Sequence, residues 1–148
     1  MSVRPLHILF ADDDPDDREM LCEELHKIDP SMVVECCENG QQALHCLHHT
    51  AALPNLLLID YQMPLLTGAD VLAALQPHSQ YHDLLKVVWS TSNDRAYADK
   101  CITHGAHYYL PKPFDMRNLH RIACFLHSLA SEKTSTDPVR TMSFYSHF

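Results

Sequence analysis

Short apolar runs alternate along the chain with segments in which apolar residues recur every three or four positions. The runs predict five strands, at residues 6–11, 32–36, 56–59, 84–89 and 108–110. The segments between them predict helices, at residues 16–28, 41–50, 69–75, 95–103 and 116–129. The run from Leu56 to Ile59 has no polar alternation, which is typical of a strand covered on both faces.

This alternation of strand and helix predicts an α/β fold. We expect a doubly wound, five-stranded parallel sheet with five helices on its two faces. Right-handed crossovers leave few topologies for such a sheet. The pattern ends after Ala130, so we expect one domain over residues 5–130. Residues 131–148 are polar with late aromatics and are expected to form a flexible C-terminal tail without a second domain.

Composition narrows the class of protein. The chain has 148 residues, of which 46% are hydrophobic and 20% charged, an ordinary globular balance. The net charge of −8 argues against a nucleic-acid partner. No apolar run approaches the ~20 residues that span a bilayer, and no signal peptide is apparent behind Met1. We therefore expect a cytoplasmic protein with no membrane partner.

Cysteine and histidine are frequent, but their spacing is not that of a metal site. The six cysteines form no CxxC pair, and most lie in segments with apolar periodicity, so they are expected to be reduced and buried. The twelve histidines include the pair His48-His49, without cysteine or carboxylate partners at ligand spacing. Neither residue type predicts a cofactor.

Chemically capable residues follow four of the five predicted strands. Asp12-Asp13-Asp14 ends the first strand, Asp60 the third, Ser90 the fourth and Lys112 the fifth. Because ligands of doubly wound sheets bind beyond the carboxyl ends of the strands, these residues should share one edge. Close carboxylates need a cation to stay ionised together, and Mg²⁺ suits them. With Lys112 and the Ser90 hydroxyl, the set is suited to phosphoryl transfer.

Each of these residues also has a purely structural interpretation. The aspartates of residues 12–17 could favour a helix N-terminus, Asp60 could form a turn, and Lys112 could be exposed. Residues 12–23 also place carboxylates at EF-hand positions, but Asp17 stands where that loop requires glycine. The coincidence of four strand ends favours a functional site over these separate explanations.

Two longer motifs carry a resemblance to a known family. Asp60 to Gly68 matches the pattern D-x-x-M-P-x-x-x-G, and Gly105 to Phe114 matches G-A-x-x-Y-x-x-K-P-F. With the acidic pair Asp12-Asp13 and Ser90, residues 5–130 resemble the receiver domain of bacterial two-component response regulators, of the stand-alone, chemotaxis-regulator-like kind. The resemblance implies a flavodoxin-like strand order, 2-1-3-4-5.

The resemblance also implies roles for individual residues. Asp60 would be the nucleophile and phosphoacceptor. Asp13 and Asp60 would bind Mg²⁺ directly, Asp12 through water, and the backbone carbonyl of Gln62 would be a further ligand. Lys112 would pair with Asp60 or its phosphate.

A switch is implied as well. Ser90 would turn its hydroxyl toward the phosphate, and the ring of Tyr109 would follow inward. The peptide bond between Lys112 and Pro113 would be cis. Ser90 stands where threonine is commoner, which keeps the hydroxyl but loses β-branching.

The implied function is phosphorelay signal transduction by a phosphoprotein. A sensor histidine kinase or phosphotransfer protein would supply the phosphoryl group, and an unidentified downstream protein would receive the signal. The chain would not be an enzyme in the ordinary sense, although it would catalyse its own phosphorylation and dephosphorylation.

Two alternatives stay open. One is a phosphatase-like enzyme that uses Asp12 or Asp13 as nucleophile. The other is a degenerate receiver that binds partners without phosphorylation, against which the intact Asp13, Asp60, Ser90 and Lys112 argue.

Overall fold

Strands and helices alternate throughout the computed structural model, which describes residues 4–132 and 143–144. In this part of the chain the strands are β1 (His7–Ala11), β2 (Val33–Cys37), β3 (Leu56–Asp60), β4 (Leu85–Ser90), β5 (Tyr108–Pro111) and β6 (Ser143–Phe144). The helices are α1 (Pro15–Ile28), α2 (Gly40–His49), α3 (Gly68–Leu75), α4 (Arg95–Thr103) and α5 (Met116–Glu132), with a 3₁₀ turn at Ser79–Tyr81. The predicted bounds agree with these within one helical turn.

The sheet has the order β2-β1-β3-β4-β5-β6, and all its pairs are parallel. The doubly wound α/β class and the order of the first five strands are therefore confirmed. The two-residue strand β6 was not expected, and it pairs with β5 through the register Tyr108↔Ser143. It covers part of an edge whose backbone groups would otherwise lack strand partners.

The structure describes two parts of the segment 131–148. Ser131 and Glu132 belong to α5, and Ser143–Phe144 form β6. The rest of that segment lies outside the described residues.

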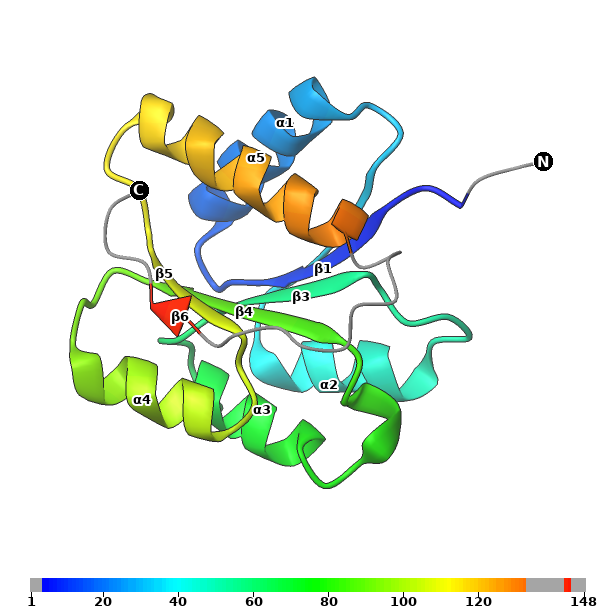
Figure 1. The fold of residues 1–148 in the computed structure, drawn as a ribbon, viewed down its shortest axis with the longest axis vertical. Coiled ribbons are helices and arrows are strands. Elements are labelled where there is room, and N and C mark those ends of the chain that lie inside the picture. The colour runs from blue at the N-terminus through cyan, green and yellow to red at the C-terminus, as the bar shows by residue number, and fades with distance from the viewer. Residues whose placement is uncertain (1–3, 133–142, 145–148) are drawn as a thin grey trace.

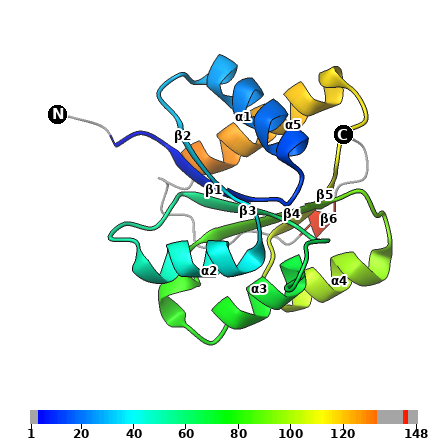
Figure 2. The ribbon, with the colours of Figure 1, turned by 180° about the vertical axis from the view of Figure 1, so that it is seen from behind.

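Helices cover both faces of the sheet, as Figure 1 and the reverse view in Figure 2 show. α1 and α5 pack side by side on one face, and α2, α3 and α4 lie on the other. The alternation of side chains along each strand divides the core accordingly. In β1, Ile8 and Phe10 face α1 and α5, whereas Leu9 and Ala11 face the other three helices. Burial on both faces explains the continuous apolar runs.

Polar side chains set the starts of four helices. Asp14, Asn39, Thr67 and Asp94 precede α1, α2, α3 and α4, and each accepts a hydrogen bond from a backbone N–H of the first turn. Within the aspartate cluster, Asp14 thus has the helix-capping role that was the structural alternative for the whole cluster. Asp12 and Asp13 precede this cap, and Asp16 and Asp17 lie in the first turn of α1.

The expectation of uniformly buried cysteines is wrong. Cys37 and Cys101 are buried, but Cys36 and Cys124 are exposed, and Cys22 and Cys46 are intermediate. All six are free thiols. The reason is that edge strand β2 and the outer faces of α1 and α5 carry thiols that the apolar period alone does not place.

Among the described residues, no helix is both long enough and apolar enough to cross a bilayer.

Candidate functional site

Four strand ends bring the predicted residues together at one edge of the sheet. Asp12 follows β1, Asp60 ends β3, Ser90 ends β4, and Lys112 follows β5. Carboxylate oxygens of Asp12, Asp13 and Asp60 lie within 4.8 Å of one another. Asp12 and Asp60 are buried and Asp13 is exposed. The site therefore joins a buried acidic pair to a carboxylate that solvent reaches.

Lys112 is the cation of this cluster. Its Nζ lies 2.9 Å from Asp12 Oδ2, 2.9 Å from Asp17 Oδ2 and 3.4 Å from Asp60 Oδ2. Burial alone would lower the pKa of Lys112, but hydrogen bonds to Asp17 and Asp12 raise it above its ordinary value. Lys112 is therefore charged at neutral pH.

Asp17 was not among the predicted site residues. It lies in the first turn of α1, where an acidic residue also favours the helix dipole. No local signal separates Asp17 from the other acidic residues of that turn, because its contact with Lys112 joins residues 95 positions apart.

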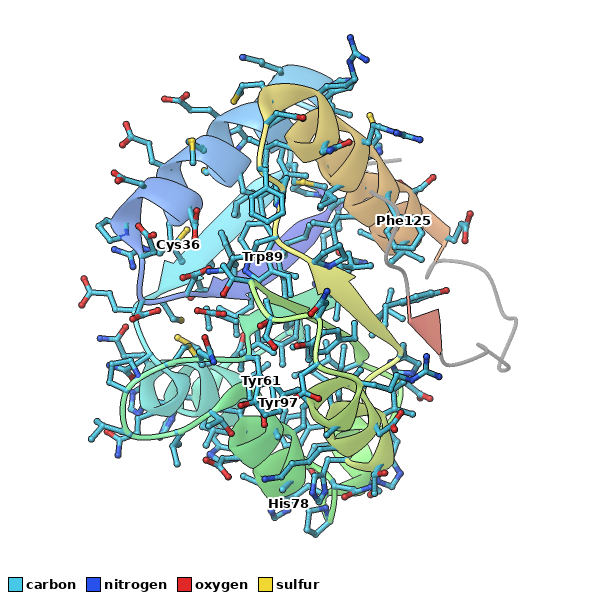
Figure 3. The ribbon with its side chains drawn as sticks, turned by 90° about the vertical axis from the view of Figure 1, so that its left-hand side faces the viewer. Cys36, Tyr61, His78, Trp89, Tyr97 and Phe125 are labelled. Carbon is cyan, nitrogen blue, oxygen red and sulfur yellow. The ribbon has the colours of Figure 1, made fainter. Side chains whose placement is uncertain are left out.

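Trp89 is the second site residue that the sequence did not identify. Its indole Nε1 donates to Asp12 Oδ2 at 2.9 Å, and Lys112 Nζ lies 5.4 Å from the ring centroid. Figure 3 labels Trp89 in the middle of the molecule, between the two helical layers. Asp12 Oδ1 accepts from the N–H of Asp14 at 2.9 Å. Both oxygens of Asp12 are thus held by protein donors, which fixes the carboxylate. No local pattern marks Trp89, which is one apolar residue in a buried strand.

Asp60 has a strongly perturbed carboxyl. Burial and the negative charge of Asp12 raise its pKa from an ordinary 3.8 to about 7. The charge of Lys112 and the backbone N–H of Gln62, 3.3 Å from Asp60 Oδ1, act in the opposite direction. A carboxylate that repels its neighbour and lacks solvent gains most from an added cation.

Gly68 allows the loop after Asp60 to fold back over β3. The N–H of Gly68 donates to the Tyr61 carbonyl at 2.9 Å. A Cβ at this position would lie 2.9 Å from the Asp60 carbonyl oxygen and 3.1 Å from Tyr61 Cα. The glycine of the D-x-x-M-P-x-x-x-G motif is therefore required by close backbone approach at the acceptor residue.

A chain of side-chain hydrogen bonds joins Ser90 to the start of α4. Ser90 Oγ accepts from the N–H of Ser92 at 3.1 Å, and Ser92 Oγ accepts from the N–H of Asp94 at 3.1 Å. Asp94 Oδ1 in turn accepts from the N–H of Ala96 at 2.9 Å. A rotation of the Ser90 hydroxyl would therefore break the first link of a continuous path to the helix.

Tyr109 lies inside the core between the end of β4 and α4. Its ring is already fully buried, 6.5 Å from the Tyr61 ring, and its hydroxyl donates to the Ser92 carbonyl at 3.1 Å. Tyr61 itself stacks on Tyr97 of α4, with ring centroids 4.5 Å apart; Figure 3 labels the two residues close together. This is the inward position that the implied switch assigns to the ring of Tyr109. A side-chain hydrogen bond also joins Tyr109 to Ser90, so the two residues of the implied switch are in contact.

The expectation of a cis bond between Lys112 and Pro113 is wrong. The described residues contain no cis peptide bond, so this bond is trans. The trans form of a bond to proline is favoured by about 0.5–1 kcal/mol. Lys112 nevertheless reaches all three of its carboxylate partners.

The stability of the metal-free protein should depend on the ionisation of Asp60. An acid with a raised pKa in the folded state binds a proton more tightly there than in the unfolded chain. Stability is therefore expected to fall as pH rises from about 4 to about 7, at about 1.4 kcal/mol per unit of pKa shift, or a few kcal/mol in all. Urea unfolding in EDTA at about pH 5 and about pH 8 measures this loss.

Asp60→Asn should remove most of that pH dependence, and Mg²⁺ should restore stability to the wild type at the higher pH. The exposed Asp83→Asn serves as the matched control and should behave as wild type. An unchanged pH dependence of stability in Asp60→Asn would contradict the assignment of the raised pKa to Asp60.

Comparisons with known proteins agree with this fold. Residues 8–123 match the sequence model of the response regulator receiver domain. The two-component response regulator ARR17 of Arabidopsis thaliana is 31% identical over 131 residues, which cover 82% of this chain and 84% of that protein.

Two solved structures share the fold. The phosphorylated cyanobacterial phytochrome response regulator RcpA has a TM-score of 0.81 at 22% identity, and the match covers 91% of this chain and 99% of that one. The Mn²⁺-bound form of response regulator Rcp1 has a TM-score of 0.78 at 24% identity, over 91% and 100% of the two chains.

Proposed function

The chain belongs to the response regulator receiver domain family of two-component signalling, and from this premise we propose that Asp60 accepts a phosphoryl group and that the protein signals through its altered surface. The observation that carries the proposal is the arrangement around Lys112. Its Nζ contacts the buried carboxylates of Asp12 and Asp60 as well as Asp17, at the edge where four strands end. In such a cluster the ammonium can bind an anion while the carboxylates bind a cation.

The chemical step proposed is an in-line displacement. A carboxylate oxygen of Asp60 attacks phosphorus, an oxygen–phosphorus bond forms, and the bond to the histidine nitrogen of the donor breaks. Lys112, 3.4 Å from Asp60 Oδ2, would neutralise charge on the transferred group, and Ser90 would donate its hydroxyl to it.

A divalent metal ion fits the remaining acidic groups, and we propose Mg²⁺. Asp13 and Asp60 would bind it directly, Asp12 through water, and the carbonyl of Gln62 would be a further ligand. The occupation of both Asp12 oxygens by protein donors supports an indirect role for that residue. The ion would neutralise the acidic cluster and bind phosphate oxygens.

Asp60 is favoured as nucleophile over Asp12, one of the two aspartates that a phosphatase-like enzyme would use. Asp12 is wholly buried, with its oxygens held by Trp89, Asp14 and Lys112. Phosphorylation of Asp12 would therefore require several of these bonds to break. Asp60 has one oxygen near Lys112 and one near a backbone N–H.

An apolar hollow beside the site supports a protein as phosphoryl donor. It is lined by Asp17, Met20, Trp89, Pro113, Phe114, Asp115, Met116 and Leu119. Phe114 is 94% exposed, and Met20 and Met116 are also exposed. Because Asp17 and Trp89 contact the Lys112 cluster, a histidine kinase or phosphotransfer protein seated here would bring its phosphohistidine to Asp60.

The proposed output follows the hydrogen-bond path from Ser90. If the Ser90 hydroxyl turns to a phosphate, it no longer accepts from Ser92, whose carbonyl also holds Tyr109. α4 has only Ala98 and Cys101 as buried residues, so it can shift at modest cost in packing. The surface of α4, β5 and α5 would then present a changed face to a downstream protein.

Ser90→Ala tests this path. Beryllofluoride, which mimics the phosphoryl group, should shift backbone amide signals across residues 89–114 in the wild type. In Ser90→Ala these shifts should shrink severalfold, because the hydroxyl that distinguishes the two states is absent. Labelling of Asp60 should persist. Ser128→Ala, which removes an exposed hydroxyl of α5, is the matched control; shifts of wild-type size in Ser90→Ala would refute the path.

The proposed function itself is tested by intact mass. Incubation with acetyl phosphate and Mg²⁺ should add one phosphoryl group per chain, and EDTA should prevent it. The site of addition is then mapped by peptide mass after borohydride reduction of the acyl phosphate. Absence of any adduct with an intact fold would favour a degenerate receiver, and a label on Asp12 or Asp13 would favour the phosphatase-like alternative.

A further inference from the structure

Three chemically complementary side chains line up at the border between α1 and α5. Cys124 Sγ lies 3.4 Å from Nε2 of His120, and Nδ1 of the same ring lies 2.8 Å from Glu24 Oε1. Cys124 is exposed, whereas Glu24 is buried. The thiol and the histidine are on α5 and the carboxylate is on α1, so the packing of the two helices assembles the group.

The acceptor character of Glu24 determines how the histidine is protonated. An ionised carboxylate can only accept hydrogen bonds, so Nδ1 of His120 must carry the proton in their contact. In the neutral ring Nε2 then presents its lone pair, and it faces the Cys124 thiol. His120, together with Lys27, lowers the pKa of Glu24 although burial opposes this, so the carboxylate stays ionised.

We propose that Cys124 is a modification site, a nucleophilic thiol that exchanges with low-molecular-weight disulfides, with His120 as its base and Glu24 as the residue that orients His120. A nucleophile, a base and a group that orients the base are the parts of an activated thiol. This site lies apart from the acidic edge of the sheet and is independent of the phosphoacceptor proposal.

The exchange step balances as follows. The thiol proton of Cys124 passes to Nε2 of His120, and the thiolate attacks one sulfur of the disulfide. A bond forms between Cys124 Sγ and that sulfur while the disulfide bond breaks. The leaving thiolate takes the proton from His120. Cys124 is oxidised to a mixed disulfide, and half of the reagent is reduced to a thiol.

Two other cysteines serve as internal comparisons. Cys22 Sγ lies 3.7 Å from His26 Nδ1, but the other nitrogen of that ring binds the Met32 carbonyl, a neutral acceptor. Burial raises the pKa of Cys22, and Glu23 raises it further. Cys36 is exposed as a residue, but partial burial of its thiol raises the pKa of that thiol.

The three thiols therefore differ in their activation. Among the described residues no histidine is hydrogen-bonded to the Cys36 sulfur. Figure 3 shows Cys36, on edge strand β2, on the opposite side of the molecule from Phe125 of α5. Cys36 is thus an exposed thiol without a histidine base, and Cys22 is a thiol beside a histidine that no carboxylate orients.

The test measures the order of reaction along the whole chain. The reduced protein is treated briefly with dithiodipyridine, an uncharged aromatic disulfide, and each cysteine is quantified by peptide mass. Cys124 should react first, about 10-fold faster than Cys22 and Cys36. His120→Gln should slow Cys124 about 10-fold and leave Cys36 unchanged, and Glu24→Gln should slow Cys124 by less.

His127→Gln is the matched control, because His127 lies about two turns after His120 on α5 and contacts Asp29 instead. It should leave the rate of Cys124 unchanged, and tryptophan fluorescence reports whether each variant is folded. The order of reaction in the wild type stands even where a variant unfolds. Earlier reaction of Cys36 or Cys22 than of Cys124 would overturn the proposal, as would wild-type speed at Cys124 in folded His120→Gln.

Discussion

Replacement of Asp60 by asparagine is expected to abolish phosphorylation by acetyl phosphate, because the amide lacks the anionic oxygen that attacks phosphorus. Asparagine has nearly the volume of aspartate and keeps an acceptor for the N–H of Gln62, 3.3 Å away. It also removes both causes of the raised pKa of Asp60, which are the burial of a charge and the repulsion by Asp12. The variant should therefore fold well, be more stable than the wild type without metal, and carry no label.

The measurement is intact mass over time, with urea unfolding of the same samples as the check on folding. Asp83→Asn, an exposed change elsewhere, should label at the wild-type rate. Undiminished labelling of a folded Asp60→Asn protein would show that another residue accepts the phosphoryl group. Peptide mass would then show whether the exposed neighbouring Asp13 is that residue.

Lys112→Arg should have the second largest effect although it keeps the positive charge. The ammonium of Lys112 contacts three carboxylates, two of them at 2.9 Å, while lying 5.4 Å from the Trp89 ring centroid. A planar guanidinium is wider and presents its donors in one plane, so it cannot reproduce three converging contacts in that space. We expect phosphorylation about 10-fold slower or more, and loss of the amide shifts that beryllofluoride causes in the wild type.

Lys27→Arg is the matched control, since Lys27 is exposed and its contact with Glu24 is a single ion pair. It should label and respond as wild type. Phosphorylation and amide shifts of wild-type size in Lys112→Arg would mean that charge alone, without the shape of the ammonium, is sufficient at this position.

Much of the fold and of the site could be predicted from the sequence because the relevant signals are local. The alternation of apolar runs with helical spacing reflects burial of each strand on two faces, as in β3, all of whose residues are buried. The carboxyl ends of parallel strands share one edge, so the position of Asp12, Asp60, Ser90 and Lys112 in the chain was enough to predict that they converge. The structure brings these four together as expected.

Only the tertiary structure decided which atoms meet within that edge. Lys112 pairs with Asp17 across 95 residues of sequence, and Trp89 donates to Asp12 across 77. Neither contact has a local signature, because each depends on how far α1 and β4 bring their side chains toward the centre. The same packing removes solvent from Asp60 and so raises its pKa, encloses the Tyr109 ring, and places Glu24 against His120. Sequence periodicity determines which face of an element is buried, whereas distances between elements, and the charges and hydrogen bonds that depend on them, exist only once the helices have packed on the sheet.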